Sequence, residues 1–134
     1  MSDEARIWLH YAEENLRSAQ LLLAHGLLNP CLQNAQQAME KSLQAVLIAR
    51  AIPVRRTHSI QEITNLLAAN GLPSGVTAEA CNLLEAIYLP SKYPLGSALP
   101  DFAPDEEVCR QCVQVAERVA ALARQTDRPP ESTR

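Results

Sequence analysis

Two short stretches combine positive charge with groups that recognise phosphate or stack on bases. The first is Arg55-Arg56-Thr57-His58, where two guanidinium groups and an imidazole lie at an expected helix start. The unpaired amides of a helix start also favour anions, so this turn is a candidate phosphate contact. In the second stretch Lys92 lies between Tyr88 and Tyr93, and an ammonium beside aromatic rings suits a phosphate next to a stacked base. A solvated basic turn and a packed aromatic loop are the structural alternatives.

A third polar group interrupts a segment that is otherwise apolar. Gln37 and Lys41 are four residues apart, as are Gln36 and Glu40, so each pair shares a helix face. Such a group can serve a binding function, which makes Gln37 and Lys41 candidate nucleotide- or phosphate-binding residues. The alternative is a solvated stripe that is supported by pairing along the helix.

Cys109 and Cys112 form a CxxC pattern, which occurs in redox and in zinc sites. Redox use requires the pattern at a helix start beside a strand, and structural zinc requires a second ligand pair. The sequence offers neither, and both cysteines lie on the apolar side of the expected last helix. We therefore expect buried thiols without a metal.

The rest of the sequence contains no recognisable catalytic motif. His10 and His25 lack a companion carboxylate or cysteine pattern. Motifs typical of P-loop nucleotide hydrolases, dehydrogenases, zinc proteases and serine hydrolases are absent. We predict no catalytic residue, no metal and no cofactor.

Composition indicates one globular domain. The chain has 134 residues, of which 47% are hydrophobic and 20% charged, a size and balance that fit a single buried core. The net charge of -3 argues against a generally basic surface that coats nucleic acid, so an RNA contact has to be local. The sequence lacks a signal peptide pattern and an apolar run long enough for a bilayer, so we expect a cytoplasmic protein with reduced thiols.

The elements that must position the candidate residues are helices, which hydrophobic periodicity places at Asp3 to about His25, Asn29 to Arg50, Thr57 or Ser59 to about Ala69, Thr77 to about Tyr88, and Asp105 to Gln125. Four prolines exclude a continuous helix from residue 89 to 104. We predict an all-α, up-and-down bundle of about five helices over residues 1–125. Residues 126–134 are a polar tail that we expect to fray or be disordered.

The second expected helix is the centre of this bundle. Asn29 is its expected cap and Pro30 its first residue. One stripe of small residues comprises Cys31, Ala35, Ala38, Ser42, Ala45 and Ala49, and a bulkier stripe comprises Leu32, Met39, Leu43, Val46 and Leu47. This helix has apolar stripes on two faces, and the chain has few large aromatic side chains to cover them. We therefore predict that part of the apolar surface is buried between the subunits of a homodimer.

Three segments occur in an order that is typical of one family of helical domains. Residues 34–45 read Asn-Ala-Gln-Gln-Ala-Met-Glu-Lys-Ser-Leu-Gln-Ala, which is similar to that family's His-Ala-Gln-Gln-Ala-x-Glu-Lys-x-Leu-Lys-Ala signature. Residues 57–60, Thr-His-Ser-Ile, are similar to its Thr-His-Asp/Ser-Leu helix start. Residues 88–94, Tyr-Leu-Pro-Ser-Lys-Tyr-Pro, are similar to its Tyr-x-x-Ser-Arg-Tyr-Pro segment. Over roughly residues 5–124 the sequence thus resembles the HEPN domains, which are nucleotide-binding modules of higher eukaryotes and prokaryotes.

The sequence departs from the family pattern at three of these positions. Asn34, Gln44 and Lys92 stand where the family usually has His, Lys and Arg, and a lysine lacks the bidentate geometry with which arginine binds phosphate. HEPN members that cleave RNA carry an Arg followed after four to six residues by a His on a late helix. No histidine follows His58 in this sequence. Arg50 and His58 do not match the motif, because seven residues separate them and both lie too early in the chain.

The resemblance implies homodimerisation through the long helices and contact with a nucleotide or an RNA phosphate. It also implies a nucleotidyltransferase-domain protein as partner, in a toxin–antitoxin-like pair. We expect a non-catalytic binding module with no membrane contact. The alternatives are a divergent RNA-cleaving toxin subunit and a purely structural helical adaptor.

Overall fold

The computed structural model describes residues 1–53, 60–78, 80 and 105–127, and these residues form helices without any strand. The helices are α1 (Asp3–Ala24), α2 (Leu28–Ala49), α3 (Ile60–Ala69) and α5 (Glu106–Thr126). Of the helix expected from Thr77, the structure describes residues 78 and 80, and the Thr77 hydroxyl accepts a hydrogen bond of 3.0 Å from the Ala80 amide. The all-α prediction is confirmed. None of the described helices is long and apolar enough to span a bilayer.

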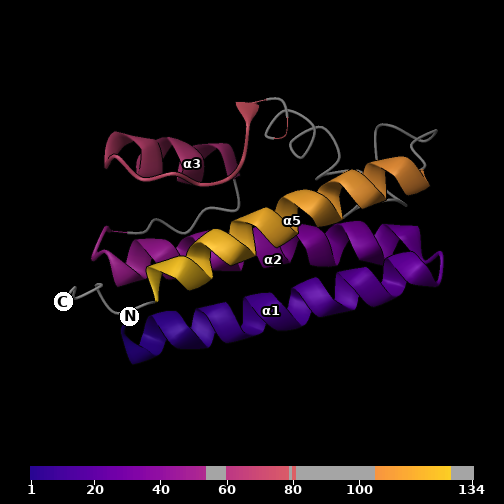
Figure 1. Cartoon of the computed structure of the whole chain (residues 1–134), viewed down its shortest axis with the longest axis horizontal. Helices are drawn as coiled ribbons and strands as arrows, with labels where there is room; N and C mark the ends of the chain where they lie inside the picture. Colours follow the sequence, from indigo (N-terminus) through magenta and orange to yellow (C-terminus); the bar gives the residue numbers. More distant parts are fainter. Residues whose placement is uncertain (54–59, 79, 81–104, 128–134) are drawn as a thin grey trace, which may run out of the picture.

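The three long helices lie side by side, and α3 lies beside α2 at one end of the molecule (Figure 1). α1 and α2 run antiparallel because Gly26, with a φ of 73°, reverses the chain between them. α5 is antiparallel to α1. From the end of α1 to its start, Gln20, Glu13 and Arg6 contact Glu117, Arg124 and the cap residue Asp127, in that order. α2 packs against α1, α3 and α5, which confirms it as the central helix.

Small residues recur every seven positions on each of the long helices. Those with at most 1% of their surface exposed are Ala5, Ala12 and Ala19 on α1, Cys31, Ala38 and Ala45 on α2, and Cys109, Ala116 and Ala123 on α5. A small side chain at the contact lets two helix axes approach closely. The bulky stripe of α2 is buried as predicted, and it fills the core between these contacts.

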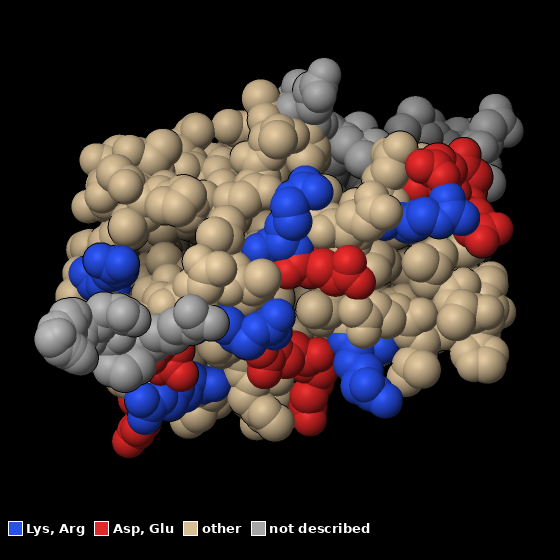
Figure 2. Space-filling view, in the orientation of Figure 1, with Lys and Arg blue, Asp and Glu red and all other residues tan. Residues whose placement is uncertain are grey.

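Charged side chains join α1 to α5 across the surface. Arg124 Nη1 lies 2.6 Å from Glu13 Oε2, and Arg6 Nε lies 3.2 Å from Asp127 Oδ1. Figure 2 shows basic and acidic side chains interspersed over this side of the molecule. The absence of a large area of one sign among the described residues of this face agrees with the expectation that any nucleic-acid contact is local.

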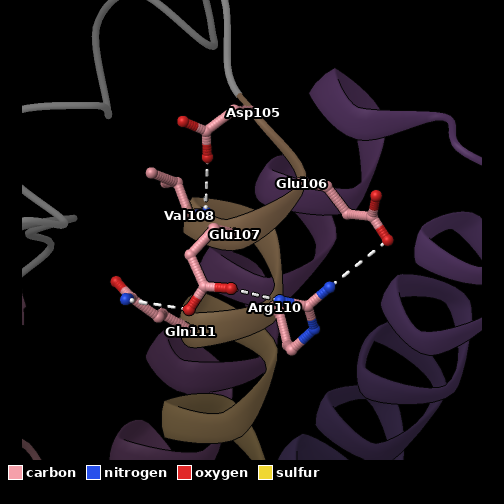
Figure 3. Close-up of polar contacts among 6 residues, drawn as sticks. All are labelled: Asp105, Glu106, Glu107, Val108, Arg110 and Gln111. Carbon is pink, nitrogen blue, oxygen red and sulfur yellow. Dashed lines mark hydrogen bonds and ion pairs between the residues drawn. The ribbon is translucent and has the colours of Figure 1, made fainter.

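The start of α5 is fixed by side-chain hydrogen bonds (Figure 3). Asp105 Oδ1 accepts a hydrogen bond of 2.8 Å from the Val108 amide, which satisfies one of the unpaired amides of the first turn. Glu106 and Glu107 follow, and Arg110 pairs with both of them along the helix surface. Negative charge at this end suits the helix dipole, so the predicted start of α5 is confirmed.

The predicted cap of α2 is wrong. The helix begins at Leu28, and its cap position is Leu27, which makes no side-chain capping hydrogen bond. The turn at Gly26 is so short that the chain re-enters a helix before it reaches Asn29. Pro30 is still acceptable, because its position in the first turn requires no amide donor.

Three of the described helices end in the same hydrogen-bonded motif, but one of them lacks glycine. After α1 and α3 the left-handed residue is Gly26 or Gly71, each with a φ of 73°. After α2 it is Ala51, with a φ of 57°. Here the Ala51 and Ile52 amides donate to the Ile48 and Leu47 carbonyls, at 3.0 and 2.9 Å, the two bonds of a Schellman motif. An alanine in this conformation carries a steric cost that glycine avoids.

We therefore expect Ala51→Gly to stabilise the protein by about 0.5–1 kcal/mol, because it removes the steric cost of the positive φ. Urea denaturation followed by circular dichroism measures the change in the free energy of unfolding. Gly71→Ala is the matched control. An added Cβ would meet nothing within 4 Å there, so its expected destabilisation is purely conformational. An Ala51→Gly protein that is no more stable than the parent would contradict this account.

Candidate functional site

The structure describes two of the eight residues that the sequence predicts as nucleotide- or phosphate-binding. Gln37 and Lys41 lie on α2, where both side chains are half-buried. The other six lie outside the described residues: Arg55, Arg56, His58, Tyr88, Lys92 and Tyr93. The geometry of a candidate site is therefore built around Lys41.

Lys41 is held at the edge of α2 by a chain of side-chain amides that crosses to α1 and returns. Its Nζ donates to Asn15 Oδ1 of α1 at 2.8 Å. Asn15 Nδ2 donates to Asn34 Oδ1 at 3.0 Å, and Asn34 Nδ2 donates to the Pro30 carbonyl at 2.9 Å. Each amide accepts on one side and donates on the other, so the chain fixes the orientation of both asparagines. It also fixes the position of the ammonium group.

An aromatic ring lies beside this ammonium group. Lys41 Nζ is 5.9 Å from the ring centroid of Tyr11, which is within the range of a cation–π contact. Half of the Tyr11 surface (50%) is exposed to solvent. The α1/α2 edge thus presents a cation and an accessible aromatic face next to each other.

No described carboxylate pairs with the charge of Lys41. Arg6, Arg110 and Arg124 each form an ion pair with an acidic side chain. Lys41 instead donates to a neutral amide. An ammonium group has three N–H donors, and Asn15 occupies one of them. The other donors and the uncompensated charge suit an incoming anion.

Gln37 lies one turn before Lys41 on the same side of α2. Within the described part of the chain its side-chain amide makes no hydrogen bond, so it can add a donor or an acceptor to this edge. Gln36 is different, because only 2% of its surface is exposed. The alternative of a solvated polar stripe is therefore wrong for Gln36.

Three contributors to this edge were missed by the sequence analysis: Tyr11, Asn15 and Asn34. Tyr11 and Asn15 are four residues apart on α1, and Asn34 and Lys41 are seven apart on α2. Polar residues at these spacings on both arms of a helical hairpin were the available signal. The register between α1 and α2, which brings them together, is a property of the folded hairpin.

The CxxC residues are in the core, as expected. Cys109 and Cys112 are fully buried beside Cys31 of α2, and all three are free thiols. Burial raises the pKa of Cys109 to about 12, and the neighbouring Cys31 adds to this shift. Burial likewise raises the pKa of Cys112 to about 12, with Cys109 the second cause. The thiolate is the reactive form of cysteine, so these groups are poor redox nucleophiles at neutral pH.

Two further observations concern metal and acid–base chemistry. No group of three or more His, Cys, Asp or Glu side chains among the described residues is arranged to hold a metal ion. His10 does have a companion carboxylate, since its Nε2 lies 3.5 Å from Glu14 Oε2. Both of these side chains are largely exposed and lie on one helix face, which is typical of a surface pair.

The comparisons with known proteins agree with the fold and with the family that the sequence resembles. The HEPN domain family matches residues 5–126, so the chain belongs to this family. The crystal structure of ST0689, an archaeal HEPN homologue, is similar with a TM-score of 0.69 and 25% identity, over 92% of this chain and 98% of that chain. The crystal structure of TT1696 from Thermus thermophilus is similar with a TM-score of 0.70 and 30% identity, over 93% and 99% of the two chains. No curated protein matches the sequence.

Proposed function

We propose that this HEPN domain is a non-catalytic, cytoplasmic module that binds a nucleotide or an RNA phosphate at the α1/α2 edge. The observation that carries the proposal is the position of Lys41. Its ammonium group has no described carboxylate partner, is fixed 2.8 Å from Asn15 Oδ1, and lies 5.9 Å from the exposed ring of Tyr11. A phosphate bound to Lys41 would leave its base or sugar within reach of an aromatic face.

The non-catalytic part of the proposal rests on the groups that surround this edge. The described side chains that contact Lys41 are the Asn15 amide and the Tyr11 phenol, which donate and accept hydrogen bonds but are weak general acids or bases at neutral pH. The His10 ring, 5.5 Å from that of Tyr11, is paired with Glu14 on the exposed face of α1. The sequence also lacks a histidine after position 58. A divergent RNA-cleaving subunit is the alternative, and RNA turnover in the binding assay would favour it.

Nucleotide or RNA binding is expected to depend on Lys41 and Tyr11 in different ways. Lys41→Ala should weaken binding of AMP and of a short RNA by about tenfold, since a charge-assisted contact is lost. It should also reduce the salt dependence by about one released counterion. Tyr11→Leu should cost about 1–3 kcal/mol per stacked base with little change in salt dependence. Calorimetric titration at two salt concentrations measures both effects.

Arg17→Ala is the matched control for charge. Arg17 is exposed and makes no hydrogen bond or ion pair among the described residues, and it lies two positions from Asn15, on the opposite side of α1. This variant should bind as the parent does. Lys92→Ala is the corresponding variant for the stretch outside the described residues, and it is expected to act like Lys41→Ala. If Lys41→Ala binds AMP and RNA as tightly as Arg17→Ala at both salt concentrations, the α1/α2 edge is not the binding site.

The proposal includes a homodimer and, from the resemblance to HEPN proteins, a nucleotidyltransferase-domain partner in a toxin–antitoxin-like pair. The large apolar side chains that are exposed among the described residues all come from α1 and its connection to α2, namely Ile7, Tyr11, Leu21 and Leu27. Ile7 and Leu21 are fourteen residues apart and share one side of α1, whereas Tyr11 lies at the edge of that side next to Lys41 of α2. An exposed apolar stripe of this kind favours burial against a second subunit.

Sedimentation velocity at micromolar concentration should therefore give twice the chain mass of 14.7 kDa. Ile7→Glu and Leu21→Glu should each shift the protein toward monomer, because a buried carboxylate at the contact is costly. Gln114→Glu, which adds the same charge at an exposed position of α5, should leave the dimer unchanged. A parent protein that sediments as a strict monomer would contradict the homodimer.

A further inference from the structure

A cleft lies between α2, α5 and the segment that follows α3. The cleft has a volume of about 200 Å³, and residues 72–74 form one of its walls. Its apolar floor comes from both helices and comprises Leu43, Val46, Val119, Leu122 and Ala123. Its polar rim comprises Arg50, Gln125 and Thr126, which lie at the ends of the same two helices.

The wall of this cleft is held in place by a close approach of backbone to α5. Gly75 follows the wall segment with a φ of 81°, and a Cβ added to it would lie 2.7 Å from Leu122 Cδ1. Only glycine combines this φ with this proximity at low cost. Arg118 Nε also donates to the Gly75 carbonyl, at 3.5 Å. The segment is therefore fixed against the helix whose residues line the cleft.

Two rim side chains have donors without a partner. Neither the Arg50 guanidinium nor the Gln125 amide makes a hydrogen bond or ion pair within the described part of the chain. Arg50 is exposed at the cap position that ends α2, and Gln125 is in the last turn of α5. The cleft thus combines an apolar floor with an uncompensated positive charge and an amide at its mouth.

We propose that this cleft binds a small organic anion, in which a compact apolar or aromatic group fills the floor and one carboxylate or phosphate contacts Arg50. A guanidinium donates two parallel hydrogen bonds to either head group, and this geometry favours it over a point charge. The apolar floor contributes by removing the ligand's ring or chain from water. A neutral ligand of the same shape would keep the burial of its apolar group but would lose the charged hydrogen bonds from Arg50.

The size and electrostatics of the cleft limit the ligand and its affinity. A volume of about 200 Å³ is below that of sites for drug-sized ligands, so the apolar group is about as large as a single ring. The carbonyl ends of α2 and α5 carry partial negative charge near the rim, which opposes an anion. Arg50 has to outweigh this effect, so affinities in roughly the millimolar range are expected.

This site is independent of the proposed nucleotide-binding edge. Leu43 of the floor is two positions from Lys41, and residues two apart project from nearly opposite sides of a helix. Loss of one site therefore leaves the other intact. A Lys41→Ala protein should therefore bind the small anion as tightly as the parent does.

Nuclear magnetic resonance titration of the full chain tests the proposal with three probes of similar shape: benzoate, phenyl phosphate and the neutral benzyl alcohol. At least one anion should shift the signals of the floor residues and bind about tenfold more tightly than benzyl alcohol. Whichever anion binds more tightly identifies the head group. Arg50→Gln should weaken anion binding by about tenfold without changing benzyl alcohol binding, and Arg17→Gln should change neither.

Three outcomes would overturn the proposal. One is equal binding of anions and benzyl alcohol, and another is the absence of signal shifts at the floor residues with any probe. The third is unchanged anion binding by Arg50→Gln. A lower melting temperature of that variant would then show that Arg50 acts only on the negative end of α2. A melting curve for each variant confirms that the titrated protein is folded.

Discussion

The fold depends on the close contact of three long helices through small residues. Each of α1, α2 and α5 has an alanine or cysteine every seven residues, and those positions have at most 1% of their surface exposed. At such contacts the backbones approach, and the larger side chains on either side interlock. Replacing one of these residues by a large one would force the helices apart, because a packed core has no spare volume. This constraint sets which helix edges meet and therefore where polar groups can lie.

The same close contact produces the polar edge between α1 and α2. Once the small residues are in contact, the neighbouring positions Asn15 on α1 and Lys41 on α2 come within hydrogen-bonding distance. A half-buried ammonium loses part of its hydration, and the neutral amides around it replace some of the lost hydrogen bonds without neutralising the charge. The remaining charge is what an anionic ligand can satisfy. Structural packing and the proposed binding function are thus linked through a single pair of helices.

The buried thiols follow from the same packing. Cys31 and Cys109 are members of the seven-residue series on α2 and α5, where cysteine serves as a small apolar residue. Their environment raises the pKa of Cys109 because the charged thiolate would lose its hydration there. The CxxC pattern therefore arises from helix packing, with Cys112 on the same buried side of α5.

Local sequence signals were enough to predict the four described helices, but not every end of them. Gly26, Gly71 and Asp105 identify ends correctly, since each residue type has a specific backbone or capping role. Asn29 misleads because the tight connection before α2 overrides its capping preference. At the site, Lys41 was predictable from its own helix. Its partners Tyr11 and Asn15 were not, because their proximity depends on the register of two helices.

The central claim is that the α1/α2 edge is the face that binds a nucleotide. Mapping of backbone and side-chain amide signals during titration of the full chain with AMP tests it most directly. The account predicts that the shifted signals cluster at Tyr11, Asn15, Asn34, Gln37 and Lys41, which only the folded hairpin brings together. Saturation with AMP that shifts signals elsewhere and leaves this cluster unchanged would contradict the account.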